Sequence, residues 1–177
     1  MAKKFLIVVD MQNDFIDAAL GTKEAQAIVP AVTERIKAAK LAGETVIATL
    51  DTHTEDYMNT AEGKKLPVPH CIKGTDGWRI RSEIMEALGD AILLEKPTFG
   101  SVQLPQLVAE LADEPESITI ELLGLCTDIC VVSNALLLKA NFPEASLRVN
   151  RACCAGVTPA RHEAALETMS SCQIEVV

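Results

Sequence analysis

The fold is decided by Phe5-Leu6-Ile7-Val8-Val9-Asp10, five consecutive apolar residues that end on an acid. A short, continuous apolar run is typical of a strand covered on both faces, as the strands of a parallel sheet are. Similar runs recur along the chain at residues 45–50, 91–94, 118–123, 147–149 and 174–177. Together these runs predict a six-stranded, mainly parallel sheet.

The segments between these runs have the spacing of helices. Over residues 23–42 apolar side chains recur every three or four positions, which gives one apolar stripe, and Gly43 follows as the stop. Thr158 and Pro159 have the pattern of an N-cap followed by a first-turn proline. Further helices are expected at residues 80–88, 103–112, 127–140 and 159–170. Alternating strands and helices predict a three-layer α/β/α, Rossmann-like architecture, with residues 1–177 as a single domain.

Composition and charge narrow the class of protein. A chain of 177 residues suits one core, and 49% hydrophobic with 23% charged residues is ordinary for a soluble protein. The formal net charge of −9 argues against nucleic acid or an anionic membrane surface as a partner. No apolar run approaches the ~20 residues that span a bilayer, and residues 1–10 lack the shape of a signal peptide. We therefore expect a cytoplasmic protein whose six cysteines are thiols.

Chemically reactive side chains follow four of the predicted strands. In an open parallel sheet, ligands bind outside the carboxyl ends of the strands. The reactive residues are, in strand order, Asp10, Asp51 with His53, Lys96, and Cys126 with Cys130. Each alone has an ordinary explanation, such as a turn residue or a packed thiol. Their convergence on one edge of the sheet indicates a catalytic site.

Cys130 is the better candidate nucleophile. Thr127 can cap the helix that follows, which would put Cys130 in its first turn, where unsatisfied N–H groups and the helix dipole favour a thiolate. We expect Lys96 to lower the pKa of this thiol further. Asp10 would accept the thiol proton and return it to a leaving amine. Cys126 remains a competing candidate because it lies in the same turn.

In this order, these residues resemble the isochorismatase-like hydrolase superfamily, and within it the cysteine amidases, nicotinamidases above all. The resemblance rests on residues 9–15 (VDMQNDF), Lys96 and residues 124–131 (GLCTDICV), and it covers essentially the whole chain. It implies the isochorismatase-like hydrolase fold and a catalytic triad of Asp10, Lys96 and Cys130.

The resemblance also implies details of the nucleophile turn. The peptide bond between Leu125 and Cys126 is expected to be cis. The backbone N–H groups of Cys126 and Cys130 are expected to form the oxyanion hole. True isochorismatases lack the nucleophilic cysteine, so its presence here favours the amidase branch.

A second group of residues resembles the nicotinamidase metal motif. It implies Asp51, His53 and His70 as ligands, with Glu62 as a fourth from the intervening loop. Imidazole and carboxylate ligands suit one divalent transition metal, with Zn²⁺ first and Fe²⁺ or Mn²⁺ as alternatives. The alternative interpretation is that His53 and His70 are loop residues that bind no metal.

Four aromatic residues are candidates for substrate binding. Phe15 matches the ring-stacking phenylalanine of the family, and Tyr57, Trp78 and Phe99 are further candidate pocket walls, although each ring could equally belong to the core. The expected reaction is hydrolysis of a small-molecule amide, nicotinamide to nicotinate and ammonia, with a metal position holding the ring nitrogen. We also expect a homo-oligomer.

Two other functions compete with this one. The first is an amidase of the same superfamily that acts on N-carbamoyl or ureido compounds, whose members generally lack the metal cluster. The second is a thiol-based redox or zinc-binding regulatory module. Its paired ligand spacing is absent, since the chain offers only Cys126-x3-Cys130 and the adjacent Cys153-Cys154.

Overall fold

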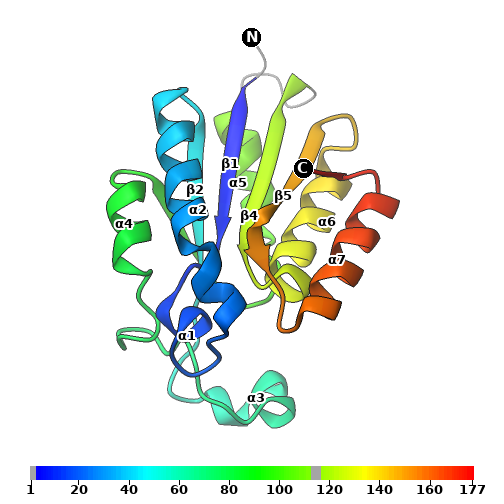
Figure 1. Ribbon diagram of the computed structural model, residues 1–177. Helices are drawn as coiled ribbons and strands as arrows, with labels where there is room; N and C mark the ends of the chain where they lie inside the picture. Colours follow the sequence, from blue (N-terminus) through cyan, green and yellow to red (C-terminus); the bar gives the residue numbers. More distant parts are fainter. Residues whose placement is uncertain (1–2, 113–116) are drawn as a thin grey trace.

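The computed structural model describes residues 3–112 and 117–177 and contains the predicted parallel sheet (Figure 1). Its six strands lie in the order β3-β2-β1-β4-β5-β6, and every neighbouring pair is parallel. The strands are β1 (Lys4–Val9), β2 (Thr45–Asp51), β3 (Ile92–Lys96), β4 (Thr119–Leu125), β5 (Ser146–Ala155) and β6 (Glu175–Val176). The predicted fold class is therefore confirmed.

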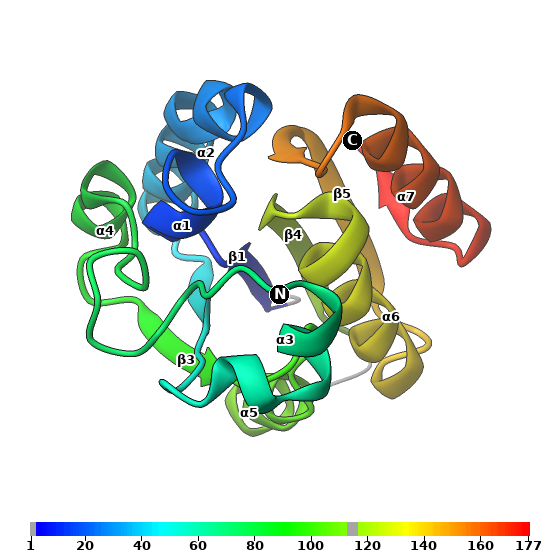
Figure 2. The same cartoon turned by 90° about the horizontal axis from the view of Figure 1, so that it is seen from below.

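Helices cover both faces of this sheet. They are α1 (Asn13–Ile16), α2 (Lys23–Leu41), α3 (Ala61–Lys65), α4 (Ser82–Leu88), α5 (Gln103–Leu111), α6 (Val132–Asn141) and α7 (Pro159–Ser171). Figure 2 shows α2 and α4 on one face and α5, α6 and α7 on the other. Two short helices, α1 and α3, lie beyond the carboxyl ends of the strands (Figure 1) and were not predicted, because neither is long enough to show an apolar period.

The core sits where the apolar runs cross the middle of the sheet. From Phe5 to Val9, the side chains of β1 are at most 1% exposed, which explains why this run does not alternate with polar residues. The Thr158 side chain caps α7 by accepting a hydrogen bond from the Arg161 N–H, as its position before Pro159 predicts. Among the described residues, no helix is long and apolar enough to cross a membrane.

Candidate active site

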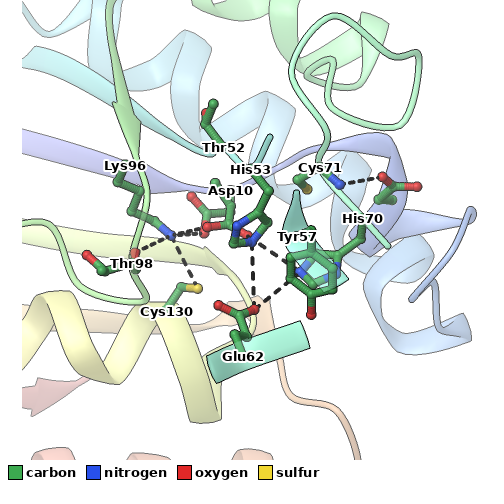
Figure 3. A network of polar contacts seen from close by, with 12 residues as sticks. Asp10, Thr52, His53, Tyr57, Glu62, His70, Cys71, Lys96, Thr98 and Cys130 are labelled. Carbon is green, nitrogen blue, oxygen red and sulfur yellow. Dashed lines mark hydrogen bonds and ion pairs between the residues drawn. The ribbon is translucent and has the colours of Figure 1, made fainter. Parts of the chain in front are cut away.

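Parallel strands bring Asp10, Lys96 and Cys130 into contact at one edge of the sheet. The Lys96 Nζ lies 2.6 Å from Asp10 Oδ2 and 3.4 Å from Cys130 Sγ (Figure 3). It also lies 3.4 Å from Asp51 Oδ1, because Asp51 and Lys96 are register partners at the ends of β2 and β3. The Thr98 carbonyl oxygen accepts a further hydrogen bond from the ammonium at 3.1 Å. The buried Lys96 ammonium therefore contacts both other residues predicted for the triad, Asp10 and Cys130.

Asp10 is held by its neighbour strand in an uncommon backbone conformation. It follows β1 with a φ of +46°, in the left-handed region that side-chain-bearing residues rarely adopt. Its N–H donates to the Thr49 carbonyl oxygen at 3.2 Å, and the Thr49 hydroxyl donates to Asp10 Oδ1 at 2.7 Å. The second carboxylate oxygen is thereby left to face Lys96 and the thiol.

Cys130 lies in a π-helical turn that spans Thr127–Val131 and precedes α6. The N–H groups of Ile129 and Val131 both donate to the Cys126 carbonyl oxygen, each at 3.1 Å. The pattern of residues 127–140 predicted one helix, whereas the segment begins with this wider turn and α6 follows from Val132. The Leu125–Cys126 peptide is cis, as the family resemblance implied.

Gly124 lets β1 and β4 approach each other next to this turn. It has a φ of +118°, and a Cβ atom there would lie 2.2 Å from the Val9 carbonyl oxygen, far inside van der Waals contact. Only glycine fits without moving one of the two strands. The close approach sets Asp10, which follows Val9, beside the turn that carries Cys130.

Burial gives the triad residues unusual proton affinities. Burial and the neighbouring Asp10 raise the pKa of the Cys130 thiol well above its ordinary value, and Lys96 only partly opposes this. Lys96 lowers this pKa, as we expected, but the expected net lowering was wrong, because Cys130 is 4% exposed and the carboxylates of Asp10 and Asp51 act on it. Burial also raises the pKa of Asp10, against the effect of Lys96. The raised pKa keeps the Cys130 side chain a thiol at neutral pH, beside the Asp10 carboxyl group.

His53, His70 and Glu62 lie close together next to Asp10, Lys96 and Cys130 (Figure 3), and Asp51 lies within ion-pair distance of both histidines. Asp51 Oδ2 lies 3.0 Å from His53 Nε2 and 3.6 Å from His70 Nε2, and Glu62 Oε1 lies 3.7 Å and 3.6 Å from the same nitrogens. The ligand atoms of the Asp and the two His lie within 4.8 Å of one another. His53 Nε2 is buried and forms no well-directed hydrogen bond within the described residues. This donor set fits a divalent metal ion.

Other contacts orient these candidate ligands. His70 Nδ1 lies 2.8 Å from the Val68 carbonyl oxygen, so a proton on Nδ1 leaves Nε2 free to bind a metal. Although burial alone would raise it, His53 and His70 hold the pKa of the Asp51 carboxyl well below its usual range. The carboxylate is therefore charged, as a metal ligand must be.

A cavity with largely apolar walls opens above the thiol. It is lined by Phe15, Leu20, Asp51, Glu62, Leu66, His70, Phe99, Cys126, Ile129 and Cys130. Two of the four predicted aromatic walls, Phe15 and Phe99, are therefore in place. The aliphatic walls Leu20, Leu66 and Ile129 were not predicted, because an isolated leucine or isoleucine carries no signal that separates a pocket wall from the core.

The other two predicted aromatic walls lie elsewhere. Trp78 faces a separate groove between α4 and β3, and its indole N–H donates to the Thr52 hydroxyl at 2.9 Å. Tyr57 is 1% exposed and packs against the metal cluster, with its ring tilted by 59° to that of His53 and the two centroids 4.8 Å apart. Its hydroxyl donates to the Leu66 carbonyl oxygen. Neither ring lines the cavity: Tyr57 is buried in the core, and Trp78 is partly buried, packs against the edge of the core and lines the separate groove.

Comparison with known proteins places this geometry in a family. A family model described as the isochorismatase domain matches residues 4–177. The chain belongs to the isochorismatase family. It is 30% identical over 143 residues to the isochorismatase family protein PncA of Bacillus subtilis. The aligned region covers 76% of this chain and 77% of that protein.

Solved structures in this family have the same fold. The zinc complex of Pyrococcus horikoshii pyrazinamidase matches with a TM-score of 0.82 and 28% identity, over 99% of this chain and 98% of that one. An N-carbamoylsarcosine amidase from Thermoplasma acidophilum matches with a TM-score of 0.78 and 26% identity, over 98% and 95% of the two chains. The chain is thus a nicotinamidase-like amide hydrolase of the isochorismatase family.

Two buried amides hold the site of this isochorismatase-family hydrolase, and the sequence analysis missed both. The Gln12 side chain donates to the Asp51 carbonyl oxygen at 2.9 Å and accepts from the Asp51 N–H at 2.8 Å. The Asn134 side chain donates to the Cys130 carbonyl oxygen at 2.8 Å and accepts from the Ser101 N–H at 2.9 Å. For Asn134, the available signal was an amide four residues after Cys130, followed by four apolar residues of the same helix.

Proposed function

We propose that this protein hydrolyses the carboxamide of a small heteroaromatic compound, nicotinamide first, to the carboxylic acid and ammonia. The observation that carries the proposal is the placement of the Cys130 thiol. It lies at a cavity with largely apolar walls that include Phe15 and Phe99, where Lys96 and Asp10 contact the thiol and the metal cluster contributes Asp51, Glu62 and His70 to the lining.

The first half of the reaction forms a thioester. Asp10 takes the thiol proton, and the Cys130 sulfur bonds to the amide carbon while the carbonyl electron pair moves to oxygen. The backbone N–H groups of Cys126 and Cys130 would stabilise this oxyanion, with each donor typically contributing ~3–4 kcal/mol. Asp10 returns the proton to the amide nitrogen, the C–N bond breaks, and ammonia leaves.

The second half releases the acid. Asp10 deprotonates a water molecule, whose oxygen bonds to the thioester carbon, and the C–S bond breaks to regenerate sulfur for protonation. Lys96 holds Asp10 and the sulfur together in both halves. Its neighbours support this role: although burial alone would lower it, Asp10 and Cys130 raise the pKa of the Lys96 ammonium, so it stays charged.

A metal ion would complete the opposite wall of the cavity. Asp51, His53, His70 and Glu62 would hold it, and Zn²⁺ is our first choice because imidazole and carboxylate ligands suit it. When bound, the ion would supply a Lewis-acidic position for a ring nitrogen of the substrate. The described metal cluster contains no cysteine, which weighs against the thiol-based regulatory module.

An N-carbamoyl amide hydrolase is the second candidate, supported by the likeness to the Thermoplasma enzyme. An N-carbamoyl amino acid carries a carboxylate, which a binding site would pair with arginine or lysine. Among the described residues that line the cavity, none is an arginine or a lysine, and Lys96 below it is already paired with Asp10. The apolar walls therefore favour an uncharged ring.

The homo-oligomer that we expect from the sequence stays a prediction.

The direct test is ammonia release from nicotinamide by the purified protein, with and without a chelator. We expect turnover that falls after chelation and returns when Zn²⁺, Fe²⁺ or Mn²⁺ is added back. Hydrolysis of an N-carbamoyl amino acid, with none of nicotinamide, would replace this proposal with the second candidate.

A further inference from the structure

His162 is the one histidine of the chain's three that lies outside the metal cluster. It is partly buried on α7, and its Nδ1 lies 2.8 Å from the hydroxyl oxygen of Thr127. Thr127 is fully buried and begins the π-helical turn. It directly follows Cys126 and comes three residues before Cys130. A side-chain hydrogen bond thus joins α7 to the turn that carries Cys130.

A second contact ties the same turn to the same part of the chain. Asp128 Oδ1 accepts a hydrogen bond from the Val157 N–H at 2.9 Å. Gly156 packs tightly against both α7 and the turn, since a Cβ there would lie 2.8 Å from the backbone nitrogen of His162 and 3.0 Å from Asp128 Oδ1. The first two residues of the turn are therefore anchored from outside, whereas the turn's internal hydrogen bonds only fix its shape.

The Thr127 hydroxyl gives this contact a direction. Because it is buried, the hydroxyl needs an acceptor, and His162 Nδ1 in the neutral ring supplies one. Burial lowers the pKa of His162. The charged groups close enough to influence this pKa are Glu163 on α7 and Asp128 on the turn, which raise it, and Arg151 on β5, which lowers it. A neutral imidazole is the form that lets Thr127 donate.

We propose that His162 is a positioning residue, which through Thr127 holds the Cys126 N–H and the Cys130 thiol in the arrangement that attack on the amide requires. The inference rests on the proposed function, because it assigns a role within the same reaction. His162 does not touch the cavity, so its removal should slow the chemical step and leave substrate binding almost unchanged.

The test compares His162→Ala with His162→Asn, whose amide places a hydrogen-bonding atom near the position of Nδ1. We expect His162→Ala to lower kcat for nicotinamide on the order of tenfold or more, with KM within about twofold. His162→Asn should recover most of that loss. Glu167→Ala, an exposed change on the same helix, is the matched control and should leave both constants unchanged.

A second variant tests the path through Thr127. Thr127→Val should lower kcat as His162→Ala does, and the double variant should be no worse than the poorer single one, because both remove the same bond. Additive losses would overturn the proposal. So would a kcat of His162→Ala within twofold of the unchanged protein, or an equal defect in His162→Asn.

A readout without substrate separates this inference from the proposed function. The rate at which iodoacetamide alkylates Cys130, followed by peptide mapping, reports the placement of the thiol beside its base. If no amide is hydrolysed, yet alkylation slows in His162→Ala and recovers in His162→Asn, the proposed function fails and the positioning role stands. Should all three proteins be alkylated at the same rate, the positioning role is wrong.

Discussion

Two groups of buried charges lie on the same sheet and are built in opposite ways. Near the middle of β4, Glu121 accepts hydrogen bonds from Arg35, Arg148 and Asn150, and Arg35 also pairs with Glu44. Two carboxylates there face two guanidinium groups, so the charges balance. At the carboxyl ends of the strands, the charges do not balance.

In the site, Asp10 and Asp51 pair with the Lys96 ammonium, and Glu62 lies beside His53 and His70, which are neutral when they act as metal ligands. Three negative charges against one positive leave two in excess, which is the charge that a divalent cation would neutralise. The excess negative charge affects the pKa of Glu62. Burial raises this pKa, and the neighbouring Asp51 carboxylate raises it further. A balanced group stabilises the fold, whereas an unbalanced one is ready to bind and to move protons.

Among variants of the two groups, Cys130→Ala should have the largest effect on activity. Because the thiol is the proposed nucleophile, amide hydrolysis should fall on the order of 10⁴-fold or more, while the protein stays folded. Cys126→Ala is the control and should keep substantial activity, since only its backbone N–H is used. Steady-state ammonia release measures both. A dead Cys126→Ala with an active Cys130→Ala would reverse the assignment.

Substrate choice tests the excess charge at the metal cluster. If a bound metal holds the ring nitrogen, nicotinamide should exceed benzamide by on the order of a hundredfold in kcat/KM, because benzamide lacks that nitrogen. His53→Ala should erase the preference, whereas Asp10→Ala should abolish both reactions. Equal rates for the two amides in the unchanged protein would show that the metal does not position the ring.

The pH dependence of kcat/KM tests the unbalanced group through the pKa of Asp10. Burial raises the pKa of Asp10, so this carboxyl takes up a proton at a pH above its ordinary pKa of 3.8 as the pH falls. A protonated Asp10 cannot accept the thiol proton, so kcat/KM should fall toward acid pH from a point above that value. A profile that stays flat down to about pH 4 would contradict the role of Asp10 as base.

The balanced group predicts the smallest effect on activity. Glu121→Gln should destabilise the fold by about 1–3 kcal/mol, because Arg35 and Arg148 lose their partner, and kcat should not change. Although burial alone would raise it, Arg35 and Asn150 lower the pKa of Glu121, so its contribution is present at neutral pH and lost as the pH falls through that lowered pKa.

Urea unfolding at several pH values measures this contribution. The matched control is Glu34→Gln, because Glu34 forms an exposed pair with Lys37 and should change stability by less than about 0.5 kcal/mol. A loss of activity in Glu121→Gln at unchanged stability would contradict the division of the two groups into structural and catalytic.

Sequence reasoning worked where chemistry depends on strand ends. Asp10, Asp51 and Lys96 each follow an apolar run, and parallel pairing alone brings such residues to one edge. It failed where tertiary burial decides the outcome. The direction of the Cys130 pKa depends on how deeply the turn is packed, and no pattern in residues 124–131 reveals that depth.

The aromatic walls show the same limit. A low aromatic content makes each ring stand out, yet Trp78 and Tyr57 pack elsewhere while Leu66, with no chemical signal, lines the cavity. Side-chain direction in the loops after the strands is set by contacts between distant segments. The balanced group around Glu121 was missed for the same reason, since its members are far apart along the chain.

Gly124 shows how a residue without any chemistry can be as constrained as a nucleophile. Its missing side chain is what allows the two central strands to touch, so a saturation library at this position should yield glycine as the sole active survivor. Such intolerance would be read as a catalytic role by anyone who ranks positions by mutational sensitivity. The cause is steric, and it would persist in a descendant that had lost the reaction and kept only the scaffold.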